Sequence, residues 1–460
     1  MPHEITRRRL VKALGLGTLA STLPMPLAAA GPRKSAIVIG AGISGLAAAG
    51  TLRDAGWDVL VLEARNRIGG RINTDRSLGD VLERGANWIH GADGNPLTPL
   101  ARESGADPVQ TDYGDVLAFG PDGAVLPDDA LERAEARYEN LLERIDARLD
   151  EDDDRPLLTA LQTEMPRFLD DPVLRALGAD TEADTGGRLE NLSAYHFDED
   201  KTFDGPDMIP AGGYDRIAGQ LARGLTIRFK EPVATIRHGS ESASVETETA
   251  RYQADHVICT VPLGVLKAGA IRFDPPLPAR QTKAIGRIGF GHMAKLALTF
   301  DAPGWPEDPH FFFHAGAIRA TWPSILNLKP LNGRNTLVMI CAGEAALKAD
   351  ALSDDAITAD AMTTLRRLFG SGLPGPTGIM RSAWSRDPYA RGAYSFAAFG
   401  STPADFEALA GPAGPALQLA GEHTTANYRG TVHGAYLSGL RAAGGLLKHK
   451  APAAGSGHKP

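Results

Sequence analysis

The chain has 460 residues, of which 43% are hydrophobic and 23% charged, and its formal net charge is -8. This composition supports two or three domain-sized units with sizeable cores. The mild acidic excess argues against a nucleic-acid partner and is compatible with cationic substrates. Cys259 and Cys341 each end an apolar run, so we expect both to be buried strand residues, and nothing in the sequence calls for a disulfide.

Residues 1–30 have the order of a targeting segment. Residues 6–12 resemble the twin-arginine (Tat) export signal, an apolar stretch follows at 13–23, and three alanines at 28–30 form a small-residue cleavage site. The apolar stretch is shorter than the roughly 20 residues that a membrane-spanning helix needs. We therefore expect cleavage after Ala30, a periplasmic or secreted protein and no stable membrane anchor.

A strand, a tight turn and a helix open the folded part. The apolar run 35–39 is followed by Gly40, Gly42 and Gly45 and then by an alanine-rich segment at 46–55. In this pattern the first glycine permits the turn, the second lets a pyrophosphate approach the backbone, and the third lets the helix pack on the strand. Free N–H groups at the helix N-terminus face the phosphates. The sequence therefore predicts a dinucleotide site.

The continuation of this pattern favours FAD over NAD. A second expected strand at 57–62 leads into Glu63, an acid placed to accept hydrogen bonds from a ribose. A loop then brings Gly69 and Gly70, which permit close backbone approach, and Arg71, which can reach a phosphate. This loop is unusual in nicotinamide enzymes and resembles the second phosphate-contacting segment of flavoproteins.

The middle of the chain predicts a helix and then a return to the dinucleotide domain. Apolar residues at helical spacing from Leu131 to Leu149 predict an amphipathic helix that ends in the acidic run 151–154. Short strands that return to the dinucleotide domain are expected at 225–229, 233–236, 244–248 and 256–261.

A second sheet and a final return to the dinucleotide domain are expected further along the chain. The run 290–300 and the strand around Val338 are assigned to the second sheet, and Ser353 is expected to cap a helix at 354–369. The last strand, at 416–422, and the last helix, at 434–448, return to the dinucleotide domain, and residues 451–460 are expected to be disordered.

Five separated segments together resemble the flavin-dependent amine oxidase family. They are the glycine turn, 83–91, 260–266, 289–295, and 420–424 continued by 431–434, and they occur in the family's order. The tract 384–396 and the C-terminal block most resemble the polyamine oxidases and the amine oxidase domain of lysine-specific histone demethylase.

The resemblance implies an α/β fold in two parts. A Rossmann-like, discontinuous FAD-binding domain is expected at 34–90, 205–285 and 385–450. An α+β substrate-binding domain is expected at 91–204 and 286–384.

The resemblance also assigns catalytic roles. Lys295 corresponds to the lysine that holds a water against flavin N5 and assists the reaction with oxygen; a desolvated lysine there has a lowered pKa. Tyr394 corresponds to one wall of an aromatic cage around the substrate nitrogen, and Thr431 to the opposite wall. Trp384 begins the same tract as Tyr394 and is counted with the catalytic residues.

Two residues bear on the substrate. His90 corresponds to a histidine that meets a distal polyamine nitrogen in spermine-type oxidases, although a lone histidine is equally well explained as a structural residue. Arg429 replaces a proline often found in the family and adds a positive charge near the expected cage. It is also the candidate for binding a substrate carboxylate.

The cofactor is expected to be non-covalent FAD, because Ala393 stands where monoamine oxidases carry the cysteine that bonds to the flavin. No metal-binding motif is present. The residues expected to bind FAD are Gly40, Gly42, Ile43, Ser44, Gly45, Glu63, Ala64, Arg65, Gly69, Gly70, Arg71, Gly85, Ala86, Asn87, Trp88, Val233, Gly421, Glu422, Thr431 and Val432.

The sequence is thus interpreted as an exported FAD-dependent amine oxidase of the polyamine oxidase type, with an amine and O2 as small-molecule partners. Hydride passes from the amine to the flavin, and oxygen then yields hydrogen peroxide. Three alternatives stay open: an L-amino-acid oxidase that uses Arg429, an amine dehydrogenase with another electron acceptor, and a flavin-binding protein without turnover. The exact amine and the oligomeric state are not specified.

Overall fold

The computed structural model describes residues 33–316 and 322–448. The expected export signal at 1–30 and the expected tail at 451–460 lie outside these residues. Over the described ranges, no helix is both long and apolar enough to cross a membrane.

A five-stranded parallel sheet has the strand order β21-β12-β1-β2-β8. Its strands are β1 (Ser35–Ile39), β2 (Asp58–Glu63), β8 (Thr226–Phe229), β12 (His256–Cys259) and β21 (Leu417–Leu419). The central strand β1 is buried along almost its whole length, as a strand covered on both faces must be. Three distant stretches of the chain therefore build one Rossmann-like sheet, as the sequence predicts.

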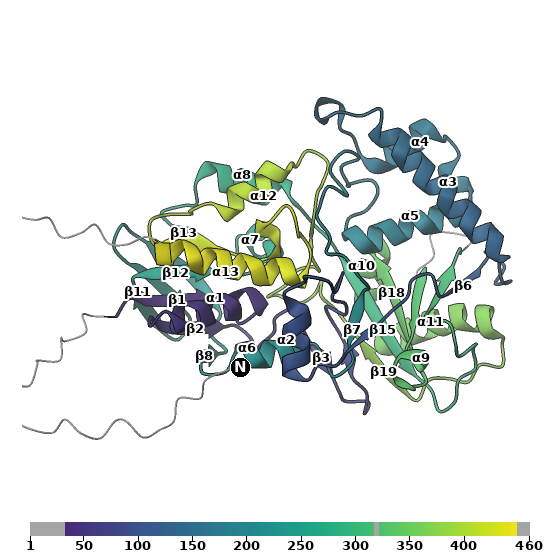
Figure 1. Cartoon of the computed structure of the whole chain (residues 1–460), viewed down its shortest axis with the longest axis horizontal. Coiled ribbons are helices and arrows are strands. Elements are labelled where there is room, and N and C mark those ends of the chain that lie inside the picture. Colours follow the sequence, from purple (N-terminus) through teal and green to yellow (C-terminus); the bar gives the residue numbers. More distant parts are fainter. Residues whose placement is uncertain (1–32, 317–321, 449–460) are drawn as a thin grey trace, which may run out of the picture. The chain divides into compact units, whose positions relative to one another are not determined.

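Helices α1 (Ile43–Asp54) and α13 (Val432–Lys448) run side by side next to this sheet (Figure 1). Their alanines and leucines share one apolar cluster with Ala36 and Val38 of β1. The helices approach closely at Gly439, where a β-carbon would lie 2.1 Å from the Ser44 carbonyl oxygen. The first and last helices of the described chain thus cover the same sheet.

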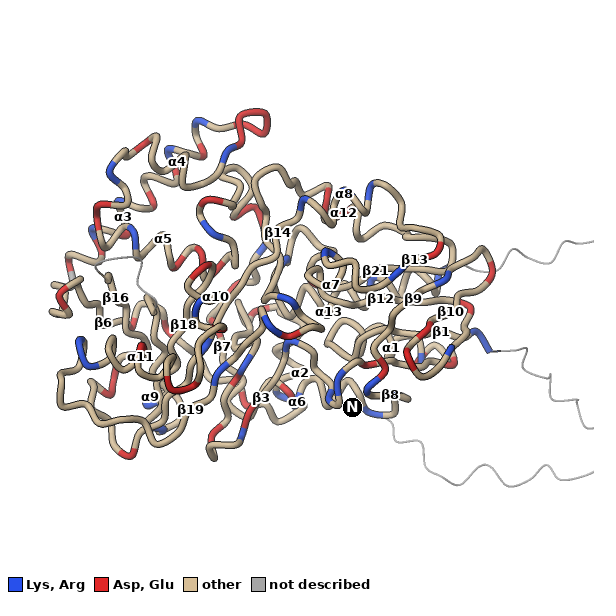
Figure 2. The backbone as a smooth tube through the Cα atoms, turned by 180° about the vertical axis from the view of Figure 1, so that it is seen from behind, with Lys and Arg blue, Asp and Glu red and all other residues tan. Residues whose placement is uncertain are grey.

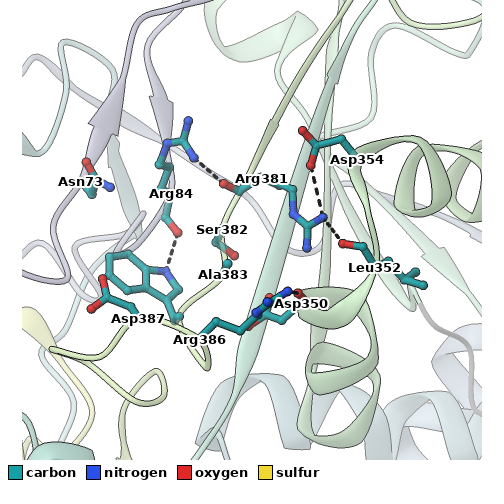
Figure 3. Close-up of a pocket in the computed structure, with 11 residues that line it drawn as sticks. Asn73, Arg84, Asp350, Leu352, Asp354, Arg381, Ser382, Ala383, Arg386 and Asp387 are labelled. Carbon is teal, nitrogen blue, oxygen red and sulfur yellow. Dashed lines mark hydrogen bonds and ion pairs between the residues drawn. The ribbon is translucent and has the colours of Figure 1, made fainter.

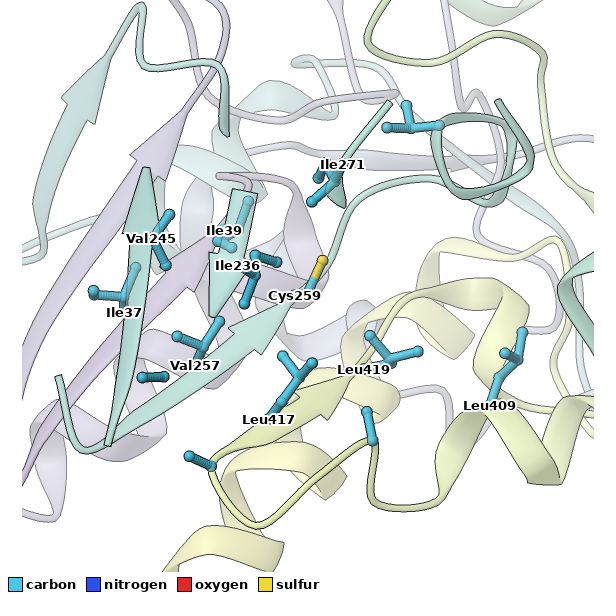
Figure 4. Packing of buried hydrophobic residues seen from close by; sticks show 14 of the residues in the cluster. Ile37, Ile39, Ile236, Val245, Val257, Cys259, Ile271, Leu409, Leu417 and Leu419 are labelled. Carbon is cyan, nitrogen blue, oxygen red and sulfur yellow. The ribbon is translucent and has the colours of Figure 1, made fainter. Parts of the chain in front are cut away.

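A second sheet, of order β11-β10-β9-β13, shares a core with the parallel sheet. Its strands are β9 (Val233–His238), β10 (Ala243–Thr247), β11 (Arg251–Ala254) and β13 (Arg272–Asp274). Ile236 and Val245 from this sheet pack with Ile37, Val257 and Leu417 from the parallel one (Figure 4). The core between the two sheets is aliphatic.

The third sheet has six strands in the order β19-β15-β18-β17-β16-β6. These are β6 (Val116–Phe119), β15 (Met293–Thr299), β16 (Phe311–His314), β17 (Ser324–Asn327), β18 (Thr336–Ala342) and β19 (Gly378–Arg381). Helices α10 (Gly343–Ala351) and α11 (Asp354–Phe369) pack on it through one apolar cluster. Helices α3 (Asp128–Asp146), α4 (Leu157–Glu164) and α5 (Pro172–Thr185) form another cluster beside it.

Short elements complete the chain. The helices are α2 (Leu97–Ser104), α6 (Asp215–Leu221), α7 (Leu263–Lys267), α8 (Ala279–Arg287), α9 (Lys329–Asn332), α12 (Pro403–Ala410), and the 3-10 turns η1 (Glu151–Asp153), η2 (Phe168–Asp170) and η3 (Glu422–Thr424). The strands are β3 (Thr74–Asp75), β4 (Leu82–Glu83), β5 (Pro108–Gln110), β7 (Met208–Pro210), β14 (Gly289–Phe290) and β20 (Ser395–Phe396). Basic and acidic residues are interspersed along the backbone in Figure 2, rather than separated by sign.

One expectation about the middle of the chain is wrong in detail. Helix α3 ends at Asp146, before the acidic run, because Asp150 caps a separate turn by accepting hydrogen bonds from the backbone N–H groups of Asp152 and Asp153. The expected strands at 233–236 and 244–248 do form, in the second sheet, which shares its core with the parallel sheet.

The run 290–300 is also divided. Gly289–Phe290 pairs with Ser395–Phe396 in a sheet of its own, and only Met293–Thr299 enters the six-stranded sheet. The Ser353 cap is confirmed, since its hydroxyl accepts from the Ala356 N–H at 3.2 Å. Both cysteines are buried and free.

Candidate active site

The glycine turn after β1 presents an open backbone surface. Helix α1 begins without a side-chain cap, so the N–H groups of its first turn are free to donate hydrogen bonds. A β-carbon at Gly42 would meet nothing closer than the Gly69 carbonyl oxygen at 4.0 Å, whereas one at Gly45 would lie 2.0 Å from the Gly40 carbonyl oxygen. Gly45 is therefore needed for packing, and Gly42 leaves space in front of the helix N-terminus.

The two predicted phosphate-contacting loops meet. The Gly69 N–H donates to the Ala41 carbonyl at 2.8 Å, and Gly42 and Gly69 form a bridge. Glu63 is buried at the end of β2 and accepts from the Ala41 N–H at 2.8 Å and from the Arg65 N–H at 2.9 Å. A carboxylate has about four lone-pair positions, so Glu63 can still accept from a hydroxyl group.

A buried ion pair joins the second loop to the C-terminal segment. The Arg71 guanidinium donates to Glu422 at 2.8 Å and to the Ala393 carbonyl at 2.7 Å. Glu422 also accepts from the Ser395 hydroxyl and from the Gly430 N–H at 3.0 Å. Burial raises the pKa of Glu422, but Arg71 and these hydrogen bonds outweigh it and hold the pKa below its ordinary value.

Backbone carbonyls after β4 hold two of the predicted catalytic side chains. The Lys295 ammonium donates to the Gly85 carbonyl at 2.6 Å, and the Trp384 indole N–H donates to the Arg84 carbonyl at 2.7 Å. Lys295 is 3% exposed and lies 5.6 Å from the centre of the Trp88 ring. Burial lowers the pKa of Lys295 to about 8, although Glu83 acts in the opposite direction. Lys295 is therefore a desolvated lysine, as predicted.

Tyr394 and the start of α13 lie close together. Gly430 is in contact with Tyr394, since a β-carbon at Gly430 would be 3.2 Å from the Tyr394 ring. The Thr431 hydroxyl donates to the Tyr428 carbonyl at 2.9 Å and accepts from the Gly434 N–H at 2.9 Å. Thr431 thus caps α13 in addition to its predicted role as a cage wall.

Acidic side chains lie near the segment that holds Tyr394. The Tyr394 hydroxyl donates to the Ala183 carbonyl, which precedes Asp184. Water reaches Asp184, yet desolvation by the surrounding protein raises its pKa to about 6. Over the described ranges, Asp184 makes no hydrogen bond.

His90 lies close enough to Asp184 for its charge to lower the pKa of that carboxyl group. Its ring nitrogen lies 2.6 Å from an Asp207 carboxylate oxygen, and its side chain is 51% exposed. Burial raises the pKa of Asp207, but the hydrogen bond and charge of His90 outweigh it and lower the pKa. Tyr113 is 50% exposed, and both burial and Asp207 raise its pKa. We call Asp184, Asp207, His90 and Tyr113 the acidic vestibule.

The Arg429 guanidinium is not free to bind a group in the acidic vestibule. It is 7% exposed and donates to the carbonyls of Ala426, His196 and Phe197 at 3.2, 3.0 and 2.8 Å, and to Asp200 at 3.1 Å. These bonds engage both terminal nitrogens of the guanidinium. Arg429 therefore clamps the loop at 196–200 to the C-terminal segment.

A polar cavity of about 480 Å³ is lined by residues from three separate parts of the chain (Figure 3). Its lining residues are Asn73, Arg84, Asp350, Leu352, Asp354, Arg381, Ser382, Ala383, Trp384, Arg386 and Asp387. Arg381 pairs with Asp354 at 3.3 Å and Arg84 with Asp75 at 2.5 Å, so much of its charge is already neutralised. No motif in the sequence indicates this cavity.

The remaining predicted cofactor residues also lie along these segments. Ser44 bonds to Ser438 across the two helices at 3.0 Å, Gly421 donates to Ser438 at 2.8 Å, and Val233 begins β9. No group of His, Cys, Asp and Glu side chains that could hold a metal ion is found within 33–316 and 322–448.

The sequence profile of a family described as flavin-containing amine oxidoreductases matches residues 43–447. The chain belongs to this family. The arrangement fits a flavin dinucleotide: the uncapped start of α1, the open surface at Gly42 and the acceptor at Glu63 meet the needs of a pyrophosphate and a ribose.

Several relatives of this flavin-dependent amine oxidase are known. Polyamine oxidase 4 of Oryza sativa subsp. japonica is 35% identical over 429 residues, covering 89% of this chain and 88% of that protein. The possible lysine-specific histone demethylase 1 of Drosophila melanogaster is 30% identical over 561 residues, covering 90% of this chain and 63% of that protein. A solved structure of putrescine oxidase bound to putrescine has a TM-score of 0.74 and 25% identity, covering 90% of this chain and 99% of that one.

Proposed function

We propose that the protein is an exported oxidase with non-covalent FAD that oxidises a polyamine, or another primary or secondary amine, to an imine and releases hydrogen peroxide. The observation that carries this proposal is the placement of Asp184 next to Ala183, whose carbonyl holds the Tyr394 hydroxyl. An aromatic wall and a carboxylate thus lie near each other, which suits an amine that carries a second cationic nitrogen.

Each described group has a role in this proposal. The acidic vestibule binds the distal ammonium, and Tyr394 orients the reacting nitrogen. Lys295, held by Gly85, provides a proton or positive charge where oxygen is reduced. The glycine turn and Glu63 hold the FAD, with Ala393 in place of a bonding cysteine. When bound, FAD accepts a hydride from the carbon beside the amine nitrogen and passes two electrons to oxygen.

The contacts of Arg429 favour an amine over an amino acid. A carboxylate-binding arginine needs free N–H donors facing the substrate, and the terminal nitrogens of Arg429 bind backbone carbonyls and Asp200. The names of the relatives, polyamine oxidase and putrescine oxidase, support the same substrate class.

Peroxide release tests the proposal. Purified, flavin-loaded protein is assayed in air with spermine, spermidine, putrescine, tyramine, benzylamine and L-amino acids, with Lys295→Met as the control. Peroxide from amines, with slow flavin reoxidation in the control, supports an amine oxidase. Turnover of amino acids alone indicates the amino-acid oxidase, and flavin bleaching without peroxide in air indicates a dehydrogenase.

Export is tested separately. The support for it is the order of arginines, apolar stretch and alanine site in residues 6–30. Cell fractionation of a bacterium with the twin-arginine pathway should find the protein in the periplasm or medium. Changing Arg7 and Arg8 to lysine should keep it in the cytoplasm, and equal export of both versions would reject the proposal.

A further inference from the structure

Glu83 is a buried carboxylate near Lys295 that the proposed chemistry does not use. It ends β4 and is 6% exposed. One carboxylate oxygen accepts from the Tyr214 N–H at 2.8 Å and from the Thr74 hydroxyl at 2.7 Å. The other oxygen is buried and has no hydrogen-bond partner in the structure. A buried carboxylate with a free oxygen is costly unless a positive charge compensates it.

The compensating charge is that of Lys295. The Lys295 ammonium is held by the Gly85 carbonyl, only two residues beyond Glu83 in the chain. Each group shifts the titration of the other: the Glu83 charge raises the pKa of Lys295, and the Lys295 charge lowers the pKa of Glu83. The two side chains form no direct ion pair among the described residues, so they interact through space.

The other groups around the two side chains do not replace this interaction. Lys295 faces the neutral Gly85 carbonyl and the Trp88 ring. Glu83 faces Thr74, Tyr214 and the like charge of Asp215, and Asp215 is itself paired with Arg76 at 2.8 Å. Arg76 also feels the charge of Glu83, which raises the pKa of Arg76, but its guanidinium is already paired with Asp215. Among the described residues, Lys295 is the cation without a carboxylate partner that lowers the pKa of Glu83.

We propose that Glu83 is a positioning residue that keeps Lys295 protonated during the reaction with oxygen. The proposal rests on the amine oxidase function above. Burial brings the two groups into one pH range, lowering the pKa of Lys295 to about 8 and raising that of Glu83 to about 7. Glu83 also borders a separate cavity of about 30 Å³, enough for a water molecule.

The first test is the pH profile of flavin reoxidation. Amine-reduced holoenzyme is mixed with oxygenated buffer between pH 6 and 9, for the wild type and Glu83→Gln. Glutamine keeps an oxygen that can accept from Tyr214 and Thr74 but lacks the charge, so the alkaline apparent pKa should fall by about one unit. Glu83→Asp, which keeps a carboxylate, should restore the wild-type profile. An unchanged profile in Glu83→Gln at full flavin content would overturn the proposal.

Two further variants guard against a folding artefact. Asp80→Asn removes another buried carboxylate, one that pairs with Arg334 at 2.7 Å, and should leave the profile unchanged. Thr74→Val removes a hydrogen bond that lowers the pKa of Glu83, so it should shift the profile in the same direction as Glu83→Gln but by less. If Glu83→Gln yields no folded holoenzyme, the absence of a shift in Thr74→Val rejects the proposal.

A thermal double-mutant cycle gives a readout that needs no turnover. Unfolding midpoints at pH 8 are compared for wild type, Glu83→Gln, Lys295→Met and the double variant. If the two charges compensate each other, the double variant should lose less than the sum of the single losses. Additive losses would overturn the proposal. Failure of every amine in the peroxide assay would reject the proposed function without affecting this cycle.

Discussion

Arg71 and Glu422 form an ion pair at 2.8 Å in the candidate flavin site. The two residues are 351 positions apart in the chain. Their side chains are 23% and 4% exposed, so both charges are largely removed from water. Through Ala393, Ser395 and Gly430, the pair also fixes the backbone on either side of Tyr394. The candidate flavin site and the backbone that carries Tyr394 therefore share one pair of charges.

Glu422→Gln should destabilise the protein by roughly 3 kcal/mol at pH 7, because it leaves Arg71 without its charge partner. The folded state lowers the pKa of Glu422, so this stabilisation is present above the unfolded pKa of about 4.3 and is lost as pH falls through the folded value. The difference in the free energy of unfolding between wild type and Glu422→Gln, measured in urea, should be large at pH 7 and small at pH 3.5. Equal differences at both pH values would contradict this account.

Gly42→Ala should fold normally but purify with much less flavin. The added methyl group would meet nothing closer than the Gly69 carbonyl oxygen at 4.0 Å, and the backbone angle of φ -72° at this position suits alanine. It would instead occupy the space in front of the uncapped helix. Gly50→Ala on the same helix, where a β-carbon also meets nothing, is the matched control. The ratio of flavin to protein absorbance decides, and equal ratios in both variants would refute the phosphate role of Gly42.

Asp184→Asn should raise the KM for diamines and polyamines by about tenfold, a loss of about 1.4 kcal/mol, because it removes a charge that faces the distal nitrogen. Monoamines such as benzylamine should be affected much less. Glu164→Gln, at a carboxylate paired with Arg144 and Arg148 away from Tyr394, serves as the control. An equal rise in KM for both amine classes would show that Asp184 acts only on the fold.

His423 should make the protein sensitive to mild acid. Burial lowers its pKa to about 4, and both ring nitrogens are buried without hydrogen-bond partners. The unfolded chain, with a histidine pKa of about 6.5, binds the extra proton first, so stability falls as pH drops from 6.5 to 4. The loss is on the order of 3 kcal/mol. His423→Gln should flatten the dependence of the urea midpoint on pH in this window. The same pH dependence in the wild type and the variant would show that His423 is not its cause.

The sequence alone predicts the parallel sheet, the glycine turn and the burial of Lys295, because each has a local signature. The apolar run, the spacing of Gly40 and Gly45 and the apolar neighbours of Lys295 are all visible in a short window. The end of α3 was missed because a capping side chain, Asp150, competes with helix periodicity at the same place.

The site residues that have no local sequence signature act through partners far away in the chain. Glu83 matters because of Lys295, and Asp184 because its neighbour Ala183 binds Tyr394. Nothing near Arg429 in the sequence shows that the loop at 196–200 will engage its guanidinium. Such relationships depend on how the sheets bring separate segments together, and no spacing rule encodes them.

The strand order of the parallel sheet has a consequence for biosynthesis. Strand β12 is flanked by β1, which is made early, and by β21, which leaves the ribosome long afterwards. Until β21 pairs, the nascent chain carries an apolar strand with one open edge, the kind of surface that recruits chaperones or another copy of the chain. Yield during expression should therefore respond to growth temperature and chaperone supply more than to the stability of the finished protein.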